Sequence, residues 1–103
     1  MSDPSYDVRD NPAESRFEVT VDGHLAIAEY RLTDKTILFS HTEVPPALEG
    51  RGVGKALVQA GLRSARERRL LVLPVCTFFA GYLKRHPEER DIVHPDYITA
   101  LGL

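Results

Sequence analysis

The sequence predicts an α+β, or mixed α/β, fold in which an antiparallel meander continues into one strand-helix-strand unit. Three observations predict this class. Apolar and polar side chains alternate through residues 16–21, a helical spacing of apolar residues begins at residue 53, and an uninterrupted apolar run follows at residues 70–75. Strands that lead into a crossover helix and a further strand are typical of a layered sheet-and-helix domain.

The meander is predicted to contain three strands joined by two tight turns. In chain order, these strands and turns are Arg16–Val21, Asp22-Gly23, His24–Leu32, Thr33-Asp34-Lys35 and Thr36–Val44. Pro45-Pro46 ends the last strand, because proline has no N–H to donate to a strand ladder. A shorter strand at Tyr6–Arg9 is expected to pair back on Arg16 through a turn at Asn11-Pro12.

The second half of the chain is predicted to carry the helices. Val53–Arg68 reads as an amphipathic helix whose core-facing stripe is Val53, Ala56, Leu57, Ala60 and Ser64. Leu70–Val75 is too short for a buried helix, so it is expected to form an interior strand parallel to the strand before the helix. Thr77–Arg85 should form a second helix that stops before His86-Pro87, and a last helical turn is expected after Pro95.

Length and composition predict one small domain over residues 1–103, with residues 1–5 frayed. The net charge of -2 argues against a surface built for nucleic acid, so the arginines near Arg66 are interpreted as a solvated helix end. The single cysteine, Cys76, cannot form an intramolecular disulfide, and no long apolar run suggests a signal peptide or membrane span. We therefore expect a soluble, cytoplasmic protein without a membrane partner. The scattered histidines predict no metal site.

A glycine-rich loop, EGRGVGK, joins the predicted meander to the first helix. Gly50, Gly52 and Gly54 allow the main chain to bend tightly and to approach a ligand without Cβ atoms in the way. The loop opens a helix, where unsatisfied N–H groups and the positive end of the helix dipole favour an anion. Arg51 and Lys55 add positive charge. The loop is therefore predicted to bind an anion, although a tight turn alone would also use these glycines.

Two familiar phosphate motifs do not fit the loop. A P-loop requires a glycine where Glu49 stands and a serine or threonine where Ala56 stands. A dinucleotide fingerprint would require a glycine in place of Lys55. Nucleotide-triphosphate and dinucleotide binding are therefore not indicated.

The segment VPPALEGRGVG, at Val44–Gly54, resembles motif A of the GNAT N-acetyltransferase superfamily. The longer pattern is similar to a group of minimal GNAT-like proteins. It consists of HTEVPPALEGRGVGKAL, an apolar strand ending in cysteine, and a Tyr-Leu-x-x-His-Pro segment. The resemblance covers Asn11–Pro87. One position departs from the motif, because Glu49 places an acid where the family has glutamine or arginine.

The resemblance implies an acyl-CoA cosubstrate, with acetyl-CoA expected. It also implies that the strand ending near Val44 and the strand Leu70–Val75 splay apart, with pantetheine in the gap. It assigns the pantetheine contacts to the backbone of Glu43 and Val44. The pyrophosphate contacts fall on Gly50, Arg51, Gly52, Val53, Gly54 and Lys55, with backbone N–H groups as the donors. The first helices and the terminal strand pair of ordinary GNAT domains are missing, so the acceptor side should be open. The acceptor would then be an amine on a protein or a polyamine.

Four residues are candidates for the chemistry. Cys76, expected near the thioester, could form an acyl-cysteine or could be a small core residue. Tyr82 could protonate the leaving thiolate, as a tyrosine does in many GNAT enzymes, or could pack in the core. His41 and Glu43 share one strand face opposite Thr42 and could deprotonate the amine, or could simply face solvent.

Two further interpretations stay open at this point. The protein could be a non-catalytic module that binds CoA or acyl-CoA, which Glu49 and the missing acceptor walls would favour. The loop could also be purely structural. An N-acyltransferase is the leading hypothesis.

Overall fold

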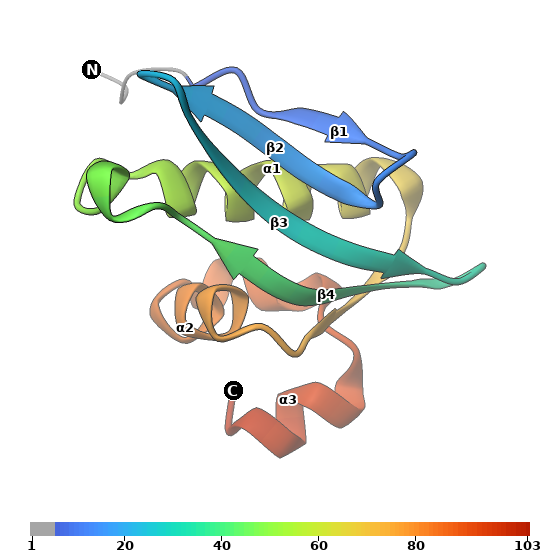
Figure 1. Cartoon of the computed structure of the whole chain (residues 1–103). Helices are drawn as coiled ribbons and strands as arrows, with labels where there is room; N and C mark the ends of the chain where they lie inside the picture. The colour runs from blue at the N-terminus through green and yellow to red at the C-terminus, as the bar shows by residue number, and fades with distance from the viewer. Residues whose placement is uncertain (1–5) are drawn as a thin grey trace.

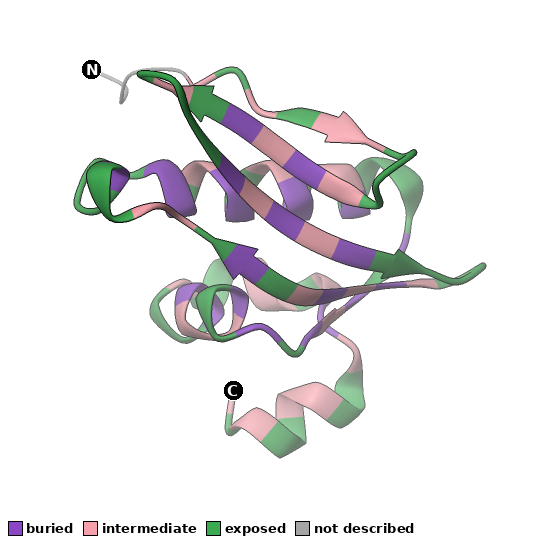
Figure 2. Cartoon of the chain, in the orientation of Figure 1, coloured by how far each residue is buried: buried purple, intermediate pink, exposed green. Residues whose placement is uncertain are grey.

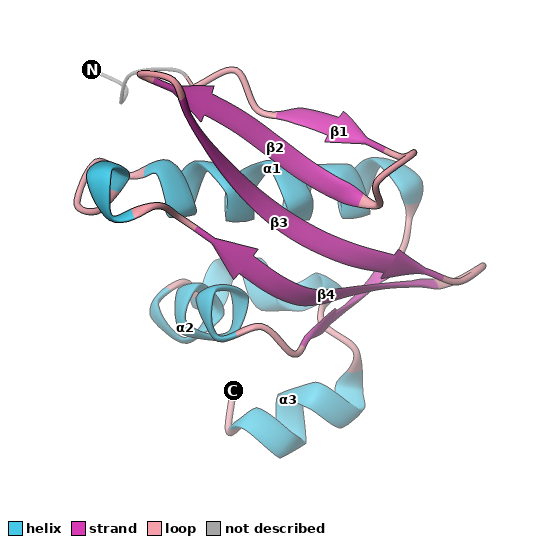
Figure 3. Ribbon diagram, viewed as in Figure 1, coloured by secondary structure: helices cyan, strands magenta, loops and turns pink. Residues whose placement is uncertain are grey.

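The computed structural model describes residues 6–103, so the expectation that residues 1–5 fray falls outside the described residues. One five-stranded sheet has the order β1-β2-β3-β4-β5. Its strands are β1 (Arg9–Asn11), β2 (Arg16–Val21), β3 (His24–Leu32), β4 (Thr36–Glu43) and β5 (Leu71–Pro74). The helices are η1 (Pro46–Leu48), α1 (Val53–Arg68), α2 (Thr77–Arg85), η2 (Pro87–Ile92) and α3 (Pro95–Leu101), with η marking 3-10 helices. Figure 1 and Figure 3 show this arrangement.

The sheet confirms the predicted fold class. Strands β1 to β4 pair antiparallel as a meander, and β5 pairs parallel to β4 after the α1 crossover. Within residues 6–103, no helix precedes β4 and no strand follows β5. In that part of the chain, no helix has the length and apolar content needed to cross a membrane.

Two strand predictions were wrong in detail. The first strand is β1 rather than Tyr6–Arg9, because Asn11 pairs with Arg16 and the turn lies at residues 12–15. Strand β5 is not interior but the last strand of the sheet. Its outer edge is partly covered, since the His94 N–H donates to the Val72 carbonyl at 3.0 Å.

Helices α1 and α2 pack on the same face of the sheet around Phe39. The Phe39 ring stacks on Phe79 of α2, with centroids 3.9 Å apart, and a Cβ on Gly61 of α1 would come within 2.8 Å of Phe39. Burial along the strands alternates accordingly (Figure 2). The core is therefore a single layer between the sheet and the two helices.

The buried stripe of α1 differs from the predicted one. Val53 and Leu57 are buried as expected, but Ala56, Ala60 and Ser64 are only half-buried. The remaining buried positions of the helix are Gly54, Val58, Gly61, Leu62 and Ala65. The stripe is rotated because glycines at two of its positions allow aromatic rings from β4 and α2 to approach the helix backbone.

A β-bulge in β4 sets which side chains face the site. Glu29 of β3 pairs with His41 whereas the next residue, Tyr30, pairs with Phe39, so Ser40 is the extra residue. The bulge changes the phase of the alternation. Phe39 and Thr42 are both buried, while His41 and Glu43 are exposed.

Candidate functional site

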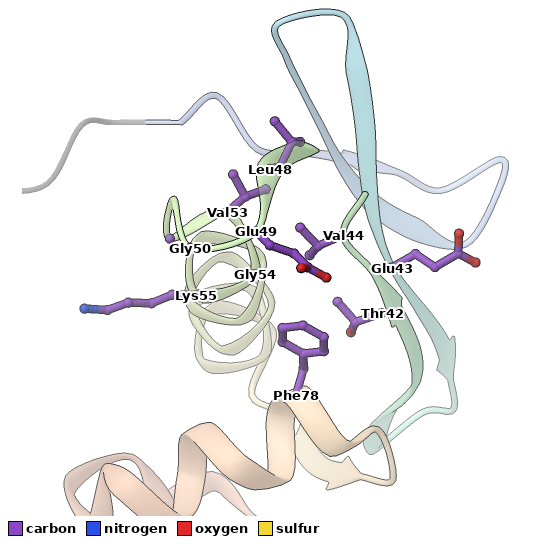
Figure 4. A pocket seen from close by; sticks show the side chains of 11 residues that line it. Thr42, Glu43, Val44, Leu48, Glu49, Gly50, Val53, Gly54, Lys55 and Phe78 are labelled. Atoms are coloured by element: carbon purple, nitrogen blue, oxygen red, sulfur yellow. The ribbon is translucent and has the colours of Figure 1, made fainter. Parts of the chain in front are cut away.

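A cavity of about 420 Å³ lies where the end of β4, the glycine loop and the starts of α1 and α2 meet (Figure 4). It is lined by Thr42, Glu43, Val44, Leu48, Glu49, Gly50, Gly52, Val53, Gly54, Lys55 and Phe78. Every residue predicted to bind the cofactor, except Arg51, lines this cavity. Thr42, Leu48 and Phe78 are lining residues that were not predicted from the sequence. The position of Phe78 in the cavity wall could not be predicted from the sequence, because no local pattern indicates that the second residue of α2 reaches the glycine loop.

Strands β4 and β5 part beside the cavity. Their parallel ladder ends at the pair Phe39 and Pro74, although β4 continues to Glu43. No strand of the described chain pairs with that edge of β4 beyond Phe39. The backbone of residues 40–44 is therefore placed where an extended ligand could add along the strand.

The three loop glycines serve two different purposes. Gly50 and Gly52 have φ of +79° and +76°, a left-handed conformation, and a Cβ added at either position would have no atom within 4 Å. They are needed for their backbone angles. Gly54 is helical, but a Cβ there would lie 2.5 Å from Cε1 of Phe78. It is needed because the Phe78 ring packs directly on the helix backbone.

The start of α1 offers backbone donors to the cavity. Gly52 is the N-cap residue and provides no side-chain cap. The N–H groups of the first helical turn, at Val53–Lys55, have no intrahelical acceptors. All three of these residues line the cavity. This open first turn fits the phosphate groups of a CoA-type ligand.

Arg51 is directed away from the cavity. Its guanidinium donates to Asp22, at the β2–β3 turn, over 2.7 Å, and its N–H donates to the Leu48 carbonyl at 3.3 Å. The hydrogen bond from Arg51 lowers the pKa of Asp22. The Tyr6 hydroxyl donates to the Arg51 carbonyl at 2.6 Å. Arg51 therefore ties the loop to the sheet and to the N-terminal segment.

The predicted bases, His41 and Glu43, lie on the exposed face of β4. The His41 Nε2 and Glu43 Oε2 atoms are 2.9 Å apart, and the two side chains are 52% and 69% exposed. Figure 4 shows the Glu43 carboxylate pointing away from the cavity. The pair is thus within reach of an acceptor that approaches the sheet from its uncovered side.

Cys76 lies behind the cavity wall. The residue is 7% exposed, and its Sγ donates to the Thr42 Oγ1 at 3.1 Å. Thr42 lines the cavity, but Cys76 does not. The Thr42 side chain therefore lies between the thiol and the cavity.

Tyr82 packs against α1 rather than in the cavity wall. It is 5% exposed, its ring stacks on His86 at 4.1 Å, and its hydroxyl accepts from Gln59 Nε2 over 3.5 Å. It does not line the cavity. Within residues 6–103, no three His, Cys, Asp or Glu side chains gather in a way that could hold a metal ion.

Comparisons with known proteins agree with this geometry. Residues 16–92 match the family described as GCN5-related N-acetyl-transferase. The chain belongs to this family. The matched region contains the whole cavity, from β4 through the loop to α2. Members of this GNAT family generally use acetyl-CoA as the cosubstrate.

Relatives of similar size support the assignment. Protein NATD1 of Xenopus tropicalis is 32% identical over 91 residues, which are 82% of this chain and 83% of that protein. Protein NATD1 of Mus musculus is 35% identical over 75 residues, which are 70% and 68% of the two chains. The solution structure of a GCN5-like putative N-acetyltransferase from Staphylococcus aureus superposes with a TM-score of 0.67 and 30% identity, and the match covers 91% of each chain. This GNAT chain therefore shares its fold with the solved structure, and it aligns with most of the length of these relatives.

Proposed function

We propose that this GNAT protein transfers an acyl group from acyl-CoA to an amine of a protein or polyamine. The proposed acyl group is acetyl. The observation that carries the proposal is the cavity that collects the motif residues at the parted edge of β4. Pyrophosphate would be held by the N–H groups of Val53–Lys55. Pantetheine would lie along the backbone of Glu43 and Val44, with Phe78 as an apolar wall.

The acceptor is proposed to approach from the uncovered face of the sheet. An amine attacks a thioester only after it loses a proton, and His41 and Glu43 form the hydrogen-bonded pair on that face. Glu43 would accept the proton directly or through water, and His41 would orient the carboxylate. A large acceptor is favoured because no helix of the described chain covers that face.

The burial of Cys76 favours direct transfer over an acyl-cysteine, because its thiol already donates to Thr42. Intact mass measured after incubation with acetyl-CoA distinguishes the two routes. Direct transfer leaves the protein mass unchanged. An acetyl adduct that disappears in Cys76→Ser would instead establish an acyl-enzyme.

Calorimetry with CoA and acetyl-CoA tests the cofactor assignment, and heat of binding together with a thermal shift is expected. If neither ligand gives a heat of binding or a thermal shift, the whole proposal is overturned.

The second candidate, a non-catalytic CoA-binding module, is favoured by the acid at Glu49 in the cavity. Release of CoA in the presence of lysine peptides and polyamines separates the two functions. Binding without transfer to any of these amines would support the module.

A further inference from the structure

The carboxylate of Glu49 occupies an unexpected place for an acid. It lines the cavity, and Figure 4 shows its side chain pointing inward, between Val44 and Gly54 and beside the Phe78 ring. Within residues 6–103, no hydrogen bond or ion pair is formed by this carboxylate. Glu49 immediately precedes the left-handed Gly50, so its position is set by the turn that shapes the loop.

The other charged side chains around the loop point elsewhere. Arg51 is held by Asp22 at 2.7 Å, outside the cavity. Figure 4 shows Lys55 extending away from the cavity and Glu43 extending away on the opposite side. Among the charged residues that line the cavity, Glu49 is therefore the one whose side chain points inward. The loop combines backbone donors suited to an anion with a carboxylate that opposes one.

We propose that Glu49 limits the affinity of the glycine loop for phosphate groups, so that the protein holds CoA weakly and releases it readily. This inference rests on the proposed function. It predicts that the affinity of the protein for pantetheine, which lacks the pyrophosphate, does not depend on the charge of Glu49. A carboxylate near the phosphates raises the free energy of the bound state by repulsion. Glu49 is exposed, so water screens this repulsion and the expected effect on affinity is modest.

The test is calorimetric titration of CoA and of pantetheine into the full chain and its variants. Glu49→Gln removes the charge at nearly constant shape, and it should tighten CoA binding about three- to tenfold. Glu49→Lys should tighten it further and should make CoA binding more salt-dependent. Pantetheine affinity should change less than about twofold in either variant. Glu67→Gln, in the exposed last turn of α1, is the matched control and should leave both affinities unchanged.

The outcomes are distinguishable. Equal CoA affinity in wild type, Glu49→Gln and Glu49→Lys would overturn the inference while leaving CoA binding intact. Equal weakening of CoA and pantetheine in Glu49→Gln would also overturn it, because that pattern means that Glu49 supports the ligand or the loop structurally. Absence of binding of either ligand by wild type and both variants would overturn the inference together with the proposed function.

Discussion

The Cys76 thiol donates a hydrogen bond to the Thr42 hydroxyl over 3.1 Å, and this bond joins the start of α2 to the bulged end of β4. Thr42 is 8% exposed and forms part of the cavity wall. The pair thus links the packing of α2 to the shape of the site.

Thr42→Val should destabilise the protein by about 1 kcal/mol, because it leaves a buried thiol without its acceptor at nearly constant volume. The measurement is urea denaturation. Thr42→Ser keeps a hydroxyl, and it should retain the hydrogen bond. A Thr42→Val protein as stable as wild type would contradict a stabilising role for this bond.

Gly54→Ala should be coupled to Phe78. The added Cβ would lie 2.5 Å from the Phe78 ring, so the ring must move away from the helix. Denaturation of Gly54→Ala, Phe78→Ala and the double variant should give a coupling energy of about 1 kcal/mol or more, since the clash disappears when the ring is removed. Additive effects of the two substitutions would show that the contact is unimportant.

Gly52→Ala should cost stability for a different reason. The φ of +76° is strained for a residue with a side chain, although no neighbouring atom would be touched. We expect a loss of about 1 kcal/mol, together with weaker CoA binding because the loop changes shape. Gly52→Asn is the control, since asparagine tolerates the left-handed region and should lose less. Equal losses in both variants would exclude backbone strain as the cause.

The ion pair between Asp22 and Arg51 should give the loop a pH-dependent stability. Arg51 lowers the pKa of Asp22 in the folded protein, so the stabilisation is present above the ordinary pKa of aspartate and is lost as the pH falls through the lowered pKa. The melting temperature of Asp22→Asn should therefore lie slightly below wild type at neutral pH, and the gap should close as the pH falls below the ordinary pKa of aspartate. The gap is small because the pair is exposed.

The matched control for the pH series is Asp34→Asn, in the exposed turn between β3 and β4. Its melting temperature should equal that of wild type at every pH of the series. A constant gap for Asp22→Asn down to the lowest pH would mean that the amide perturbs the turn and that the charge is not responsible.

Glu43→Gln should lower kcat by about a hundredfold, in keeping with the loss of a general base, while the CoA dissociation constant stays unchanged. His41→Gln should have a smaller effect, because its ring acts through the carboxylate at 2.9 Å. The measurement is the steady-state rate of acyl transfer to an amine that the wild-type protein acylates. Glu18→Gln serves as the control, since Glu18 and Glu43 are both cross-strand partners of Ile27 and share its sheet face. An equal loss in Glu18→Gln would contradict the assignment of the base.

Much of the architecture could be predicted from local patterns. The turns at Asp22-Gly23 and Thr33–Lys35, the α1 boundaries and the parallel β5 were all predicted, because they depend on neighbouring residues and on side-chain periodicity. The first strand was placed too early, since only pairing with β2 fixes its register. The position of β5 at the sheet edge likewise depends on strand order, which no local pattern contains.

The sequence by itself determined the glycine loop, its place between a strand and a helix, and its resemblance to motif A. These features are contiguous in the chain, so backbone preferences and spacing are sufficient to define them. Only the tertiary structure decided where the surrounding side chains point. The β4 bulge placed Thr42 inward, packing brought Phe78 against Gly54, and Asp22 drew Arg51 away, leaving Glu49 directed into the cavity. Each of these outcomes depends on contacts between residues distant in sequence, and the physical reason is that such contacts form only when the sheet and helices pack.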